Sequence, residues 1–193
     1  MKVVHIKTAD QRDAYLARLC AEVYGHDAGL APLVSFVGTR RELFVHEAAR
    51  LLALVDERDH PQALALLVLD EAGIGMTVTL SCSLHDDSQS PDASHRLISD
   101  LALKAPLRVE ARDQQEEMFY RSCGITRWYA GRGGVRIGLG GRHPASSLDE
   151  LTDTLSIDEQ AILRRFKHDP KGFEEEKQRF VEGLTAFEGL SWQ

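Results

Sequence analysis

The chain has 193 residues, of which 43% are hydrophobic and 27% charged, so it can form one substantial globular body with an appendage. Its formal net charge of −7 argues against proteins that coat nucleic acids or bind anionic membranes, because both classes rely on a cationic surface. Cys20, Cys82 and Cys123 are far apart and form no CxxC pair, so they indicate neither a disulfide framework nor a zinc site.

The first predicted elements are a strand and an amphipathic helix. Residues 3–6 are a short β-branched run, and apolar side chains then recur with helical spacing up to Gly25, which we expect to end the helix. The charged N-terminus lacks the apolar core of a secretory signal, and no later stretch reaches the roughly 20 apolar residues of a membrane span. We therefore expect a cytoplasmic protein. Residues 26–41 contain three helix breakers and are expected to be loop with one short helix at most.

Three apolar runs follow, at 50–55, 63–70 and 76–84, separated by segments rich in turn-forming residues. They predict an antiparallel meander. Residues 94–104 have helical spacing, and a proline separates them from the next predicted strand at 107–111. A strand, a helix and a strand in that order predict a local parallel crossover.

The helix after this crossover carries the side chain of greatest chemical interest, Tyr120. Asp113 and Glu116 have the spacing of a capping box at its start, and Gly124 is expected to end it. Its inward positions are expected to be Met118, Phe119 and Cys123. An aromatic stripe with this spacing most often belongs to the core, which is the plain explanation of Tyr120.

The remaining residues predict a hairpin and then a helical region. Apolar runs at 126–130 and 135–139 flank a glycine-rich turn. Capping-box spacing recurs twice, at Ser147 with Glu150 and at Ser156 with Glu159. Asp169-Pro170 opens a last helix with an apolar stripe, namely Phe173, Phe180, Leu184 and Phe187. We therefore divide the chain into a body, residues 1–145, and a C-terminal helical extension, residues 146–193.

This order of elements resembles the GNAT superfamily of acyl-CoA-dependent N-acyltransferases, as does one residue pattern. In the family a strand ends in Val, followed by Asn, Ala, an aliphatic-Tyr pair and Gly-Phe. The same register here gives Val109, Asp113, Glu116, Phe119-Tyr120 and Gly124-Ile125. The Val, the Tyr and the Gly match, whereas the Asn and the Ala do not. The resemblance covers the body and implies an α/β fold, with a mixed, mainly antiparallel twisted sheet flanked by helices.

In a second family pattern, a strand that ends in Val leads into Arg or Gln, two residues, Gly, one residue, and then Gly or Ala. This segment opens a helix whose backbone N–H groups hold the pyrophosphate of CoA. Here Leu84 stands at the Val, Gln89 at the Arg or Gln, Asp92 at the first Gly and Ser94 at the Gly or Ala. The resemblance implies that Leu84, Gln89, Ser94 and also Asp113 contact CoA. The alternative is a self-capped helix start, with Ser90 as N-cap and Pro91 as the first helical residue. Pro91 offers no N–H, and Asp92 would repel a phosphate.

The resemblance implies transfer of an acyl group, acetyl as the first expectation, from acyl-CoA to an amine. Tyr120 matches the position that protonates the departing thiolate, and a phenol is protonated at neutral pH as an acid must be. His85 follows the fourth strand and is the expected base, because imidazole titrates near neutrality. A polar loop explains His85 equally well. Adjacent residues on an extended chain point to alternate sides, so 85–87 do not indicate a metal site.

The rival hypothesis is a non-catalytic GNAT-like fold that binds a partner or a small ligand. In that case the C-terminal helices would cover the CoA cleft or form the face of a homodimer, although an apolar stripe most often packs on its own domain. For the transferase, the expected partners are acyl-CoA and a small-molecule or protein amine, without nucleic acid or membrane. Fold does not decide between these hypotheses, because function depends on the site.

Overall fold

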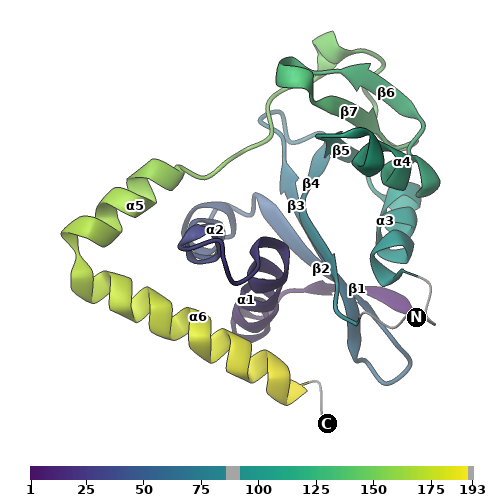
Figure 1. Cartoon of the computed structure of the whole chain (residues 1–193). Coiled ribbons are helices and arrows are strands. Elements are labelled where there is room, and N and C mark those ends of the chain that lie inside the picture. The colour runs from purple at the N-terminus through teal and green to yellow at the C-terminus, as the bar shows by residue number, and fades with distance from the viewer. Residues whose placement is uncertain (86–91, 191–193) are drawn as a thin grey trace.

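The computed structural model describes residues 1–85 and 92–190, and these form a seven-stranded sheet in the order β1-β2-β3-β4-β5-β7-β6 (Figure 1). The strands are β1 (Lys2–Ile6), β2 (Ala49–Val55), β3 (Pro61–Leu69), β4 (Met76–Ser83), β5 (Leu107–Ala111), β6 (Arg127–Ala130) and β7 (Arg136–Leu139). Only β4 and β5 are parallel neighbours in this sheet, and the other pairs are antiparallel. The predicted meander, crossover and hairpin are confirmed, and so is the predicted α/β class with a mixed, mainly antiparallel sheet flanked by helices.

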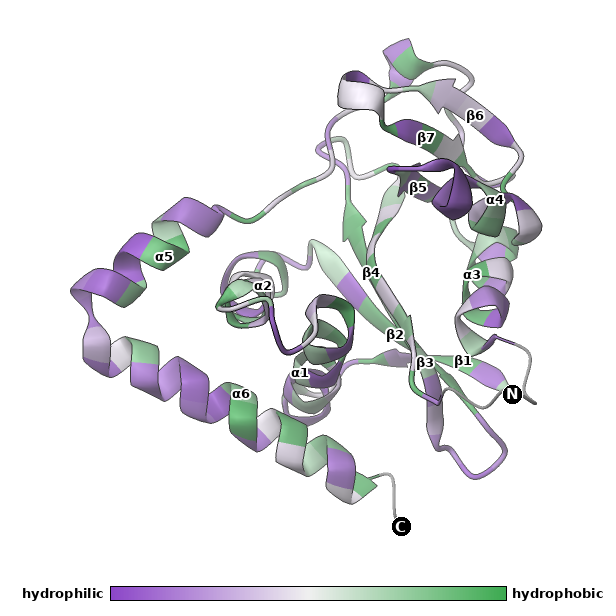
Figure 2. Ribbon diagram, viewed as in Figure 1, coloured by the Kyte–Doolittle hydropathy of each residue, from purple (hydrophilic) through white to green (hydrophobic). Residues whose placement is uncertain are grey.

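Two helix layers cover the sheet. Helices α1 (Ala9–Tyr24) and α2 (Ala31–Gly38) pack on one face, and α3 (Ala93–Lys104) and α4 (Gln114–Ser122) pack on the other (Figure 1). Alternate residues of β3 supply both cores: Leu64, Leu66 and Val68 face α1 and α2, whereas Ala63, Ala65 and Leu67 face α3. Burial on both faces explains the continuous apolar run of this strand, which Figure 2 shows as hydrophobic residues along the centre of the sheet.

The C-terminal helices α5 (Glu159–His168) and α6 (Pro170–Leu190) pack against α1 and α2 rather than over β4 and β5 (Figure 1). The ring of Phe187 lies 5.1 Å from that of Tyr15, and the ring of Phe180 lies 5.3 Å from that of Phe36, both edge to face. The apolar stripe of the last helix is therefore used within the chain, as the plain explanation predicts. These helices do not cover the cleft that the rival hypothesis assigned to them. The boundary between residues 145 and 146 remains a prediction.

Several local expectations are wrong. Residues 26–41 are more helical than expected, since α2 continues into a π-helical turn, η1 (Thr39–Leu43). Ser156 does not cap α5, because the N-cap is Asp158, whose carboxylate accepts from the N–H of Ala161 at 3.0 Å. Ser147 makes no side-chain cap either. Capping-box spacing alone does not separate neighbouring candidates for the N-cap.

The described residues include all three cysteines, which were expected to be free thiols, and the helices, none of which was expected to span a membrane. Cys20, Cys82 and Cys123 are free, and Cys20 and Cys123 are buried. Among the helices of residues 1–85 and 92–190, none is both long enough and apolar enough to span a bilayer.

Candidate functional site

Strands β4 and β5 separate soon after they begin. Their ladder contains only the pairs Met76 with Leu107 and Thr77 with Arg108, although β4 continues to Ser83. Beyond these pairs the two facing edges have no strand partner among the described residues, whereas the outer edges pair with β3 and β7. Backbone groups on such edges can hydrogen-bond an extended ligand.

A β-bulge lies on β4 where the two strands separate. Leu66 of β3 faces Leu80, and the next residue, Leu67, faces Val78, so Thr79 is the extra residue of β4. A bulge bends its strand and increases the local twist. The bulge thus accounts for the change in direction that takes β4 away from β5.

Tyr120 lies on α4 and packs against the core between α3 and the sheet. Burial, and to a smaller extent the Glu116 carboxylate, raises the pKa of the Tyr120 hydroxyl to about 12. Its hydroxyl makes no hydrogen bond to any described residue. The phenol is therefore protonated at neutral pH and has a proton to give. Met118, expected to point inward, is instead 63% exposed, whereas Cys123 is buried and Phe119 packs on the core as expected.

The end of α4 is set by a glycine, as predicted. The N–H of Ile125 donates to the carbonyl of Tyr120 at 3.2 Å, and the N–H of Gly124 donates to the carbonyl of Arg121 at 3.0 Å. With Gly124 at φ +93°, this is a Schellman motif. The motif ends the helix directly after the turn that carries Tyr120.

Replacing Gly124 with Ala should lower the free energy of unfolding by about 1–2 kcal/mol, because a Cβ is disfavoured at positive φ. A Cβ there would meet no atom within 4 Å, so the backbone conformation is the whole cause. For a chain of this size the midpoint of thermal unfolding should fall by about 2–8 °C. Gly141→Ala is the matched control, since Gly141 has open space and no positive φ. Equal stability of the two variants would contradict the prediction.

The N-terminus of α3 is capped by the chain itself. Its N-cap is Asp92, so the predicted start at Ser90 and Pro91, which lie outside the described residues, is wrong. The N–H of Ser94 donates to Asp92 Oδ1 and to Ser83 Oγ, both at 3.0 Å, and Ser83 Oγ donates to Asp92 Oδ1 at 2.6 Å. One first-turn N–H is thus occupied, and a carboxylate lies where a phosphate would be attracted. The N–H groups of Ala93 and His95 belong to the same turn and make no hydrogen bond to the described residues.

The start of α3 lies against the end of α4. The Nε2 atom of His95 lies 3.0 Å from the carbonyl oxygen of Ser122, and the ring of His95 meets the ring of Phe119 edge to face. The thiol of Cys123 donates to the carbonyl of His95 at 3.7 Å. The structure therefore brings together two of the predicted site residues, because Ser94 lies in the first turn of α3 and Tyr120 lies in the last turn of α4.

The other predicted site residues are more scattered. Asp113 caps the opposite end of α4 by accepting from the N–H of Glu116 at 2.8 Å, about 10 Å along the helix from Tyr120. The N–H of Leu84 donates to Gln62, and its side chain packs on the core of α1 and α2. His85 is exposed and makes no hydrogen bond or ion pair with the described residues. Gln89 lies outside the described residues.

Sequence reasoning missed Ser83 and His95. Ser83 ends a strand and His95 opens a helix, and neither position carries a pattern that marks a ligand site. Their contacts join segments that are 11 and 27 residues apart. Only the packing of β4, α3 and α4 reveals them.

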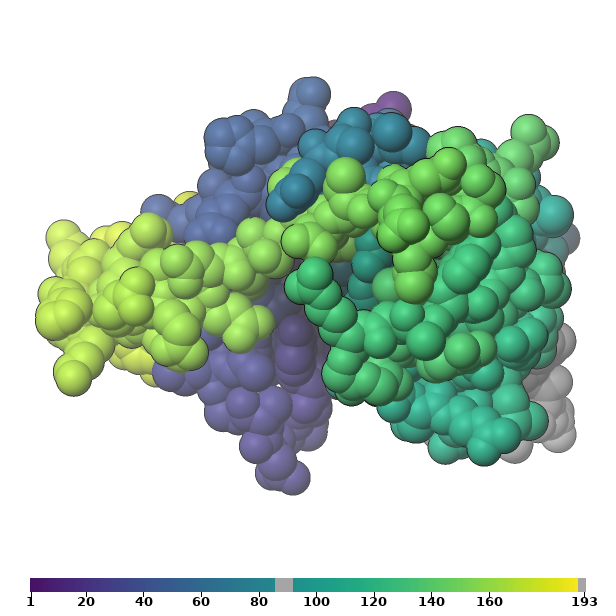
Figure 3. Space-filling view, turned by 90° about the horizontal axis from the view of Figure 1, so that it is seen from above, coloured from purple at the N-terminus to yellow at the C-terminus, as the bar shows by residue number. Residues whose placement is uncertain are grey.

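The face of the sheet opposite α3 and α4 has two hollows near β4 and β5, of about 170 and 520 Å³. The first lies beside Thr79 and Leu80, and the second beside Arg108 and Glu110. A connecting segment, residues 151–158, contributes to the walls of both. Figure 3 shows this side from above, hollowed between the purple N-terminal residues and the green residues of the β6 and β7 region.

The segment 151–158 is held to the sheet by backbone hydrogen bonds. The carbonyl of Thr152 accepts from Arg108 Nη1, the carbonyl of Asp153 accepts from the N–H of Glu71, and the N–H of Leu155 donates to Leu69, each at 2.9 Å. The path from the body to α5 is therefore fixed.

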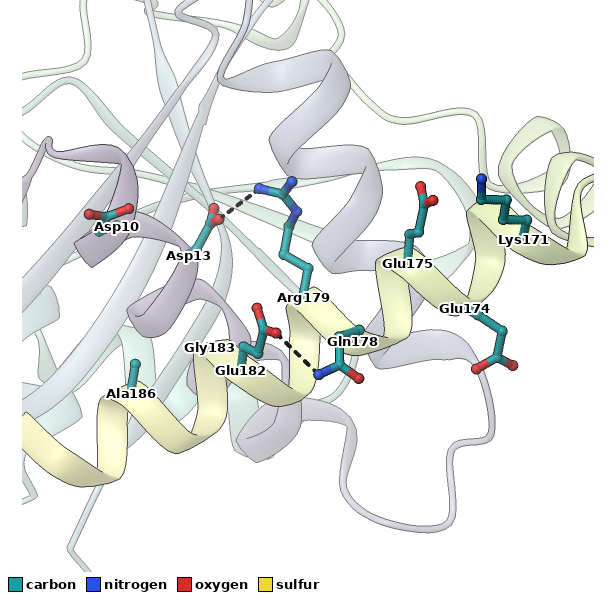
Figure 4. Close-up of a pocket in the computed structure, with 10 residues that line it drawn as sticks. All are labelled: Asp10, Asp13, Lys171, Glu174, Glu175, Gln178, Arg179, Glu182, Gly183 and Ala186. Atoms are coloured by element: carbon teal, nitrogen blue, oxygen red, sulfur yellow. Dashed lines mark hydrogen bonds and ion pairs between the residues drawn. The ribbon is translucent and has the colours of Figure 1, made fainter.

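A groove of about 710 Å³ lies between α1 and α6 (Figure 4). Five carboxylates line it together with two cations: Asp10, Asp13, Glu174, Glu175, Glu182, Lys171 and Arg179. Arg179 pairs with Asp13 at 3.5 Å. The groove lies on the far side of α1 from Tyr120, so it takes no part in the candidate site.

No protein family model matches the sequence, and no curated protein matches it. Among solved structures, the chain is similar to an aminoglycoside 6'-acetyltransferase type Ii, with 13% identity over 76% of this chain and 100% of that chain and a TM-score of 0.49. It is also similar to spermidine N-acetyltransferase from Vibrio cholerae in complex with CoA and spermine, with 10% identity over 75% and 98% and a TM-score of 0.44. A probable acetyltransferase gives 13% over 69% and 95%, with a TM-score of 0.48. Similarities of this size concern fold only, and neither activity nor substrate follows from them.

Proposed function

We propose that the protein is an N-acyltransferase that moves an acyl group, acetyl as the first expectation, from acyl-CoA to an amine. The observation that carries this proposal is the separation of β4 from β5, which leaves two unpaired strand edges, together with a half-buried Tyr120 on α4 whose hydroxyl has no hydrogen-bond partner among the described residues. In the reaction the amine nitrogen forms a bond to the thioester carbon, and the carbon–sulfur bond breaks. Tyr120 donates its proton to the departing sulfur, and His85 is the proposed acceptor of the amine proton.

The residues fit the two ends of CoA unequally. The unpaired edges of β4 and β5 suit the amide groups of an extended pantetheine arm. The start of α3 suits the pyrophosphate less well, because Asp92 already occupies the N–H of Ser94 and brings a negative charge. We propose contacts with Leu84, Gln89, Ser94 and Asp113, of which Asp113 is also needed as a helix cap.

Thermal unfolding with acetyl-CoA and with longer acyl-CoAs tests the proposal. At a ligand concentration 100 times the dissociation constant, binding should stabilise the protein by about 2.7 kcal/mol. ATP at the same concentration is the control for general effects of an anionic nucleotide. No stabilisation by about millimolar acyl-CoA would rule out the transferase.

Replacing Asp92 with Asn should tighten acyl-CoA binding. Asn is as good an N-cap as Asp, so α3 should start at the same residue while the charge is lost. A carboxylate about 4 Å from a phosphate costs about 1 kcal/mol in bulk water and about 4 kcal/mol at an effective dielectric of 20. Because Asp92 is exposed, we expect a gain near the lower end, about fivefold in affinity.

The matched control for this substitution is Asp100→Asn, on the same helix but two turns away. Isothermal titration calorimetry with acetyl-CoA measures both variants and the wild type. Equal affinity of Asp92→Asn and the wild type would show that no phosphate approaches this helix end.

The occupied N–H of Ser94 favours a second candidate, a non-catalytic protein of the same fold with an altered CoA site. This candidate requires that acyl-CoA stabilise neither the wild type nor Asp92→Asn. A homodimer also remains a proposal, although the apolar stripe of α6 is already buried against α1 and α2. Sedimentation velocity measures the oligomeric state directly.

A further inference from the structure

His143 is a buried histidine at the joint between the body and the C-terminal extension. The residue is only 5% exposed, and its Nδ1 atom accepts from the N–H of Ala145 at 3.2 Å. A ring nitrogen that accepts carries no proton, so the neutral imidazole has its proton on Nε2. Nε2 is buried and has no hydrogen-bond partner among the described residues. A buried donor without a partner is unfavourable, and its presence calls for a physical reason.

The carboxylate of Asp70 lies across Gly75 from this nitrogen. A Cβ on Gly75 would overlap His143 Nε2 and would lie 2.9 Å from Asp70 Oδ2, so the two groups flank the same glycine. The two carboxylate oxygens already accept from backbone N–H groups, Oδ1 from Ile74 at 2.9 Å and Oδ2 from Gly75 at 2.8 Å. Each oxygen keeps a second lone pair, so Asp70 can accept one more hydrogen bond without losing these two.

The other charged groups around His143 are Arg127, Arg108 and Glu150. Arg127 of β6 donates to the carbonyl of His143 itself at 2.8 Å, and Glu150 lines the same hollow as the imidazole, of about 200 Å³. Burial lowers the pKa of His143 from its ordinary value of 6.5, while the Asp70 carboxylate opposes this shift and the two arginines add to it. The imidazole is therefore neutral at pH 7.

Both possible partners of His143 touch the path from the body to α5. Ala145 is buried at the start of this path, and its carbonyl accepts from Arg127 at 2.7 Å. Asp70 forms an isolated β-bridge with Thr154, further along the same path. A change of partner at His143 would thus act on the segment that connects the extension to the sheet.

We propose that His143 is a pH-sensitive switch, which holds Ala145 when the ring is neutral and pairs with Asp70 when the ring is charged. Protonation of Nδ1 puts a donor opposite the N–H of Ala145, so that hydrogen bond is lost. The imidazolium is then attracted to the carboxylate that Nε2 already faces across Gly75. Residues 143–146 loosen, and the start of the path to α5 opens in acid. The switch needs no substrate, so it stands or falls independently of the transferase.

The direction of the pH effect follows from the lowered pKa of His143. The folded chain favours the neutral ring, so this contribution to stability is complete above pH 6.5 and is lost as the pH falls below that value. The loss stops once the ring is charged in the folded chain as well. Relative to a chain without this histidine, the equilibrium constant of unfolding should rise by up to about tenfold per pH unit in that window.

Hydrogen exchange of the backbone amides at about pH 7.5 and about pH 5, corrected for the intrinsic exchange rates, tests the switch. In the wild type, protection of the Ala145 N–H should fall about tenfold or more at the lower pH. His143→Asn offers a side-chain oxygen in place of Nδ1 and cannot titrate, so its protection should be equal at both pH values. His46→Asn, at an exposed histidine, is the matched control and should behave as the wild type does.

Equal protection of Ala145 at both pH values in the wild type would overturn the switch, as would the same fall in His143→Asn. Nitrogen-15 NMR of the wild-type ring is a check that depends on no variant. It should show the proton of the neutral ring on Nε2, and a proton on Nδ1 instead would exclude Ala145 as the neutral partner. Asp70→Asn, which keeps an oxygen for the N–H of Gly75, should shift the release of Ala145 to lower pH. An unchanged midpoint would exclude Asp70 as the second partner.

Discussion

Replacing Tyr120 with Phe should lower kcat for acyl transfer by about 100-fold or more, because general acid catalysis contributes about 10²–10⁴-fold. The substitution removes one hydroxyl that has no hydrogen bond to the described residues, so the fold should keep its stability. Binding of acetyl-CoA, followed by calorimetry, should also stay unchanged. Loss of rate with retained binding would separate an acid from a packing residue.

The pH profile gives an independent check on Tyr120. An acid acts in its protonated form, and burial raises the pKa of this hydroxyl to about 12. The wild-type rate should therefore show no fall from deprotonation of Tyr120 below pH 11. Tyr129→Phe, on β6, is the matched control. The hydroxyl of Tyr129 donates to the carbonyl of Ser146 at 3.2 Å, and its removal should leave kcat unchanged. Equal rates for Tyr120→Phe and the wild type would remove Tyr120 from the mechanism.

Elements with a strong local period were predictable from the sequence. The apolar run of β3 forms a strand that is buried on both faces, whereas β5 buries Leu107, Val109 and Ala111 on one face and exposes Glu110 on the other. Gly124 ends α4 because the left-handed conformation at that point requires it. Tyr120 could be placed near the helix end for the same reason, whereas the inward orientation expected of Met118 is wrong.

The electrostatics of the site could not be predicted in the same way. Asp92, rather than Ser90, caps α3 because the hydroxyl of Ser83 completes its bonding, and that contact depends on how β4 ends against the helix. Gly38 lies in a stretch with helix breakers, and the side chain of Ile157 from the distant extension packs directly against it. Contacts between segments far apart in sequence leave no period in either segment.

The C-terminal extension is joined to the body through η1. This π-helical turn contributes Thr39 and Leu43 to the hollow beside Thr79 and Leu80, and Arg40 and Arg41 of the same turn reach the last helix. Arg40 Nη1 donates to Glu176 Oε2 at 3.1 Å, and Arg41 Nε donates to Glu176 Oε1 at 2.8 Å. Arg40 also pairs with Asp13 of α1 at 3.0 Å. One buried carboxylate thus fixes α6 to this turn.

Replacing Glu176 with Ala should lower the free energy of unfolding by about 3 kcal/mol, at the low end of the cost of breaking a buried ion pair. Glu176 is only 7% exposed, and its loss leaves the Arg40 guanidinium buried with Asp13 alone. Arg41 is more exposed and can be rehydrated, which limits the loss. The midpoint of thermal unfolding should fall by about 6–12 °C, and urea unfolding should give the same change in free energy.

Glu174→Ala is the control for this substitution on the same helix. Its carboxylate is 69% exposed and lies 3.5 Å from Lys177, so its removal should change stability by less than about 0.5 kcal/mol. A loss below about 1 kcal/mol for Glu176→Ala would show that the pair does not hold the extension in place. Together the two substitutions separate the effect of a buried carboxylate with two arginine partners from that of an exposed ion pair on the same helix.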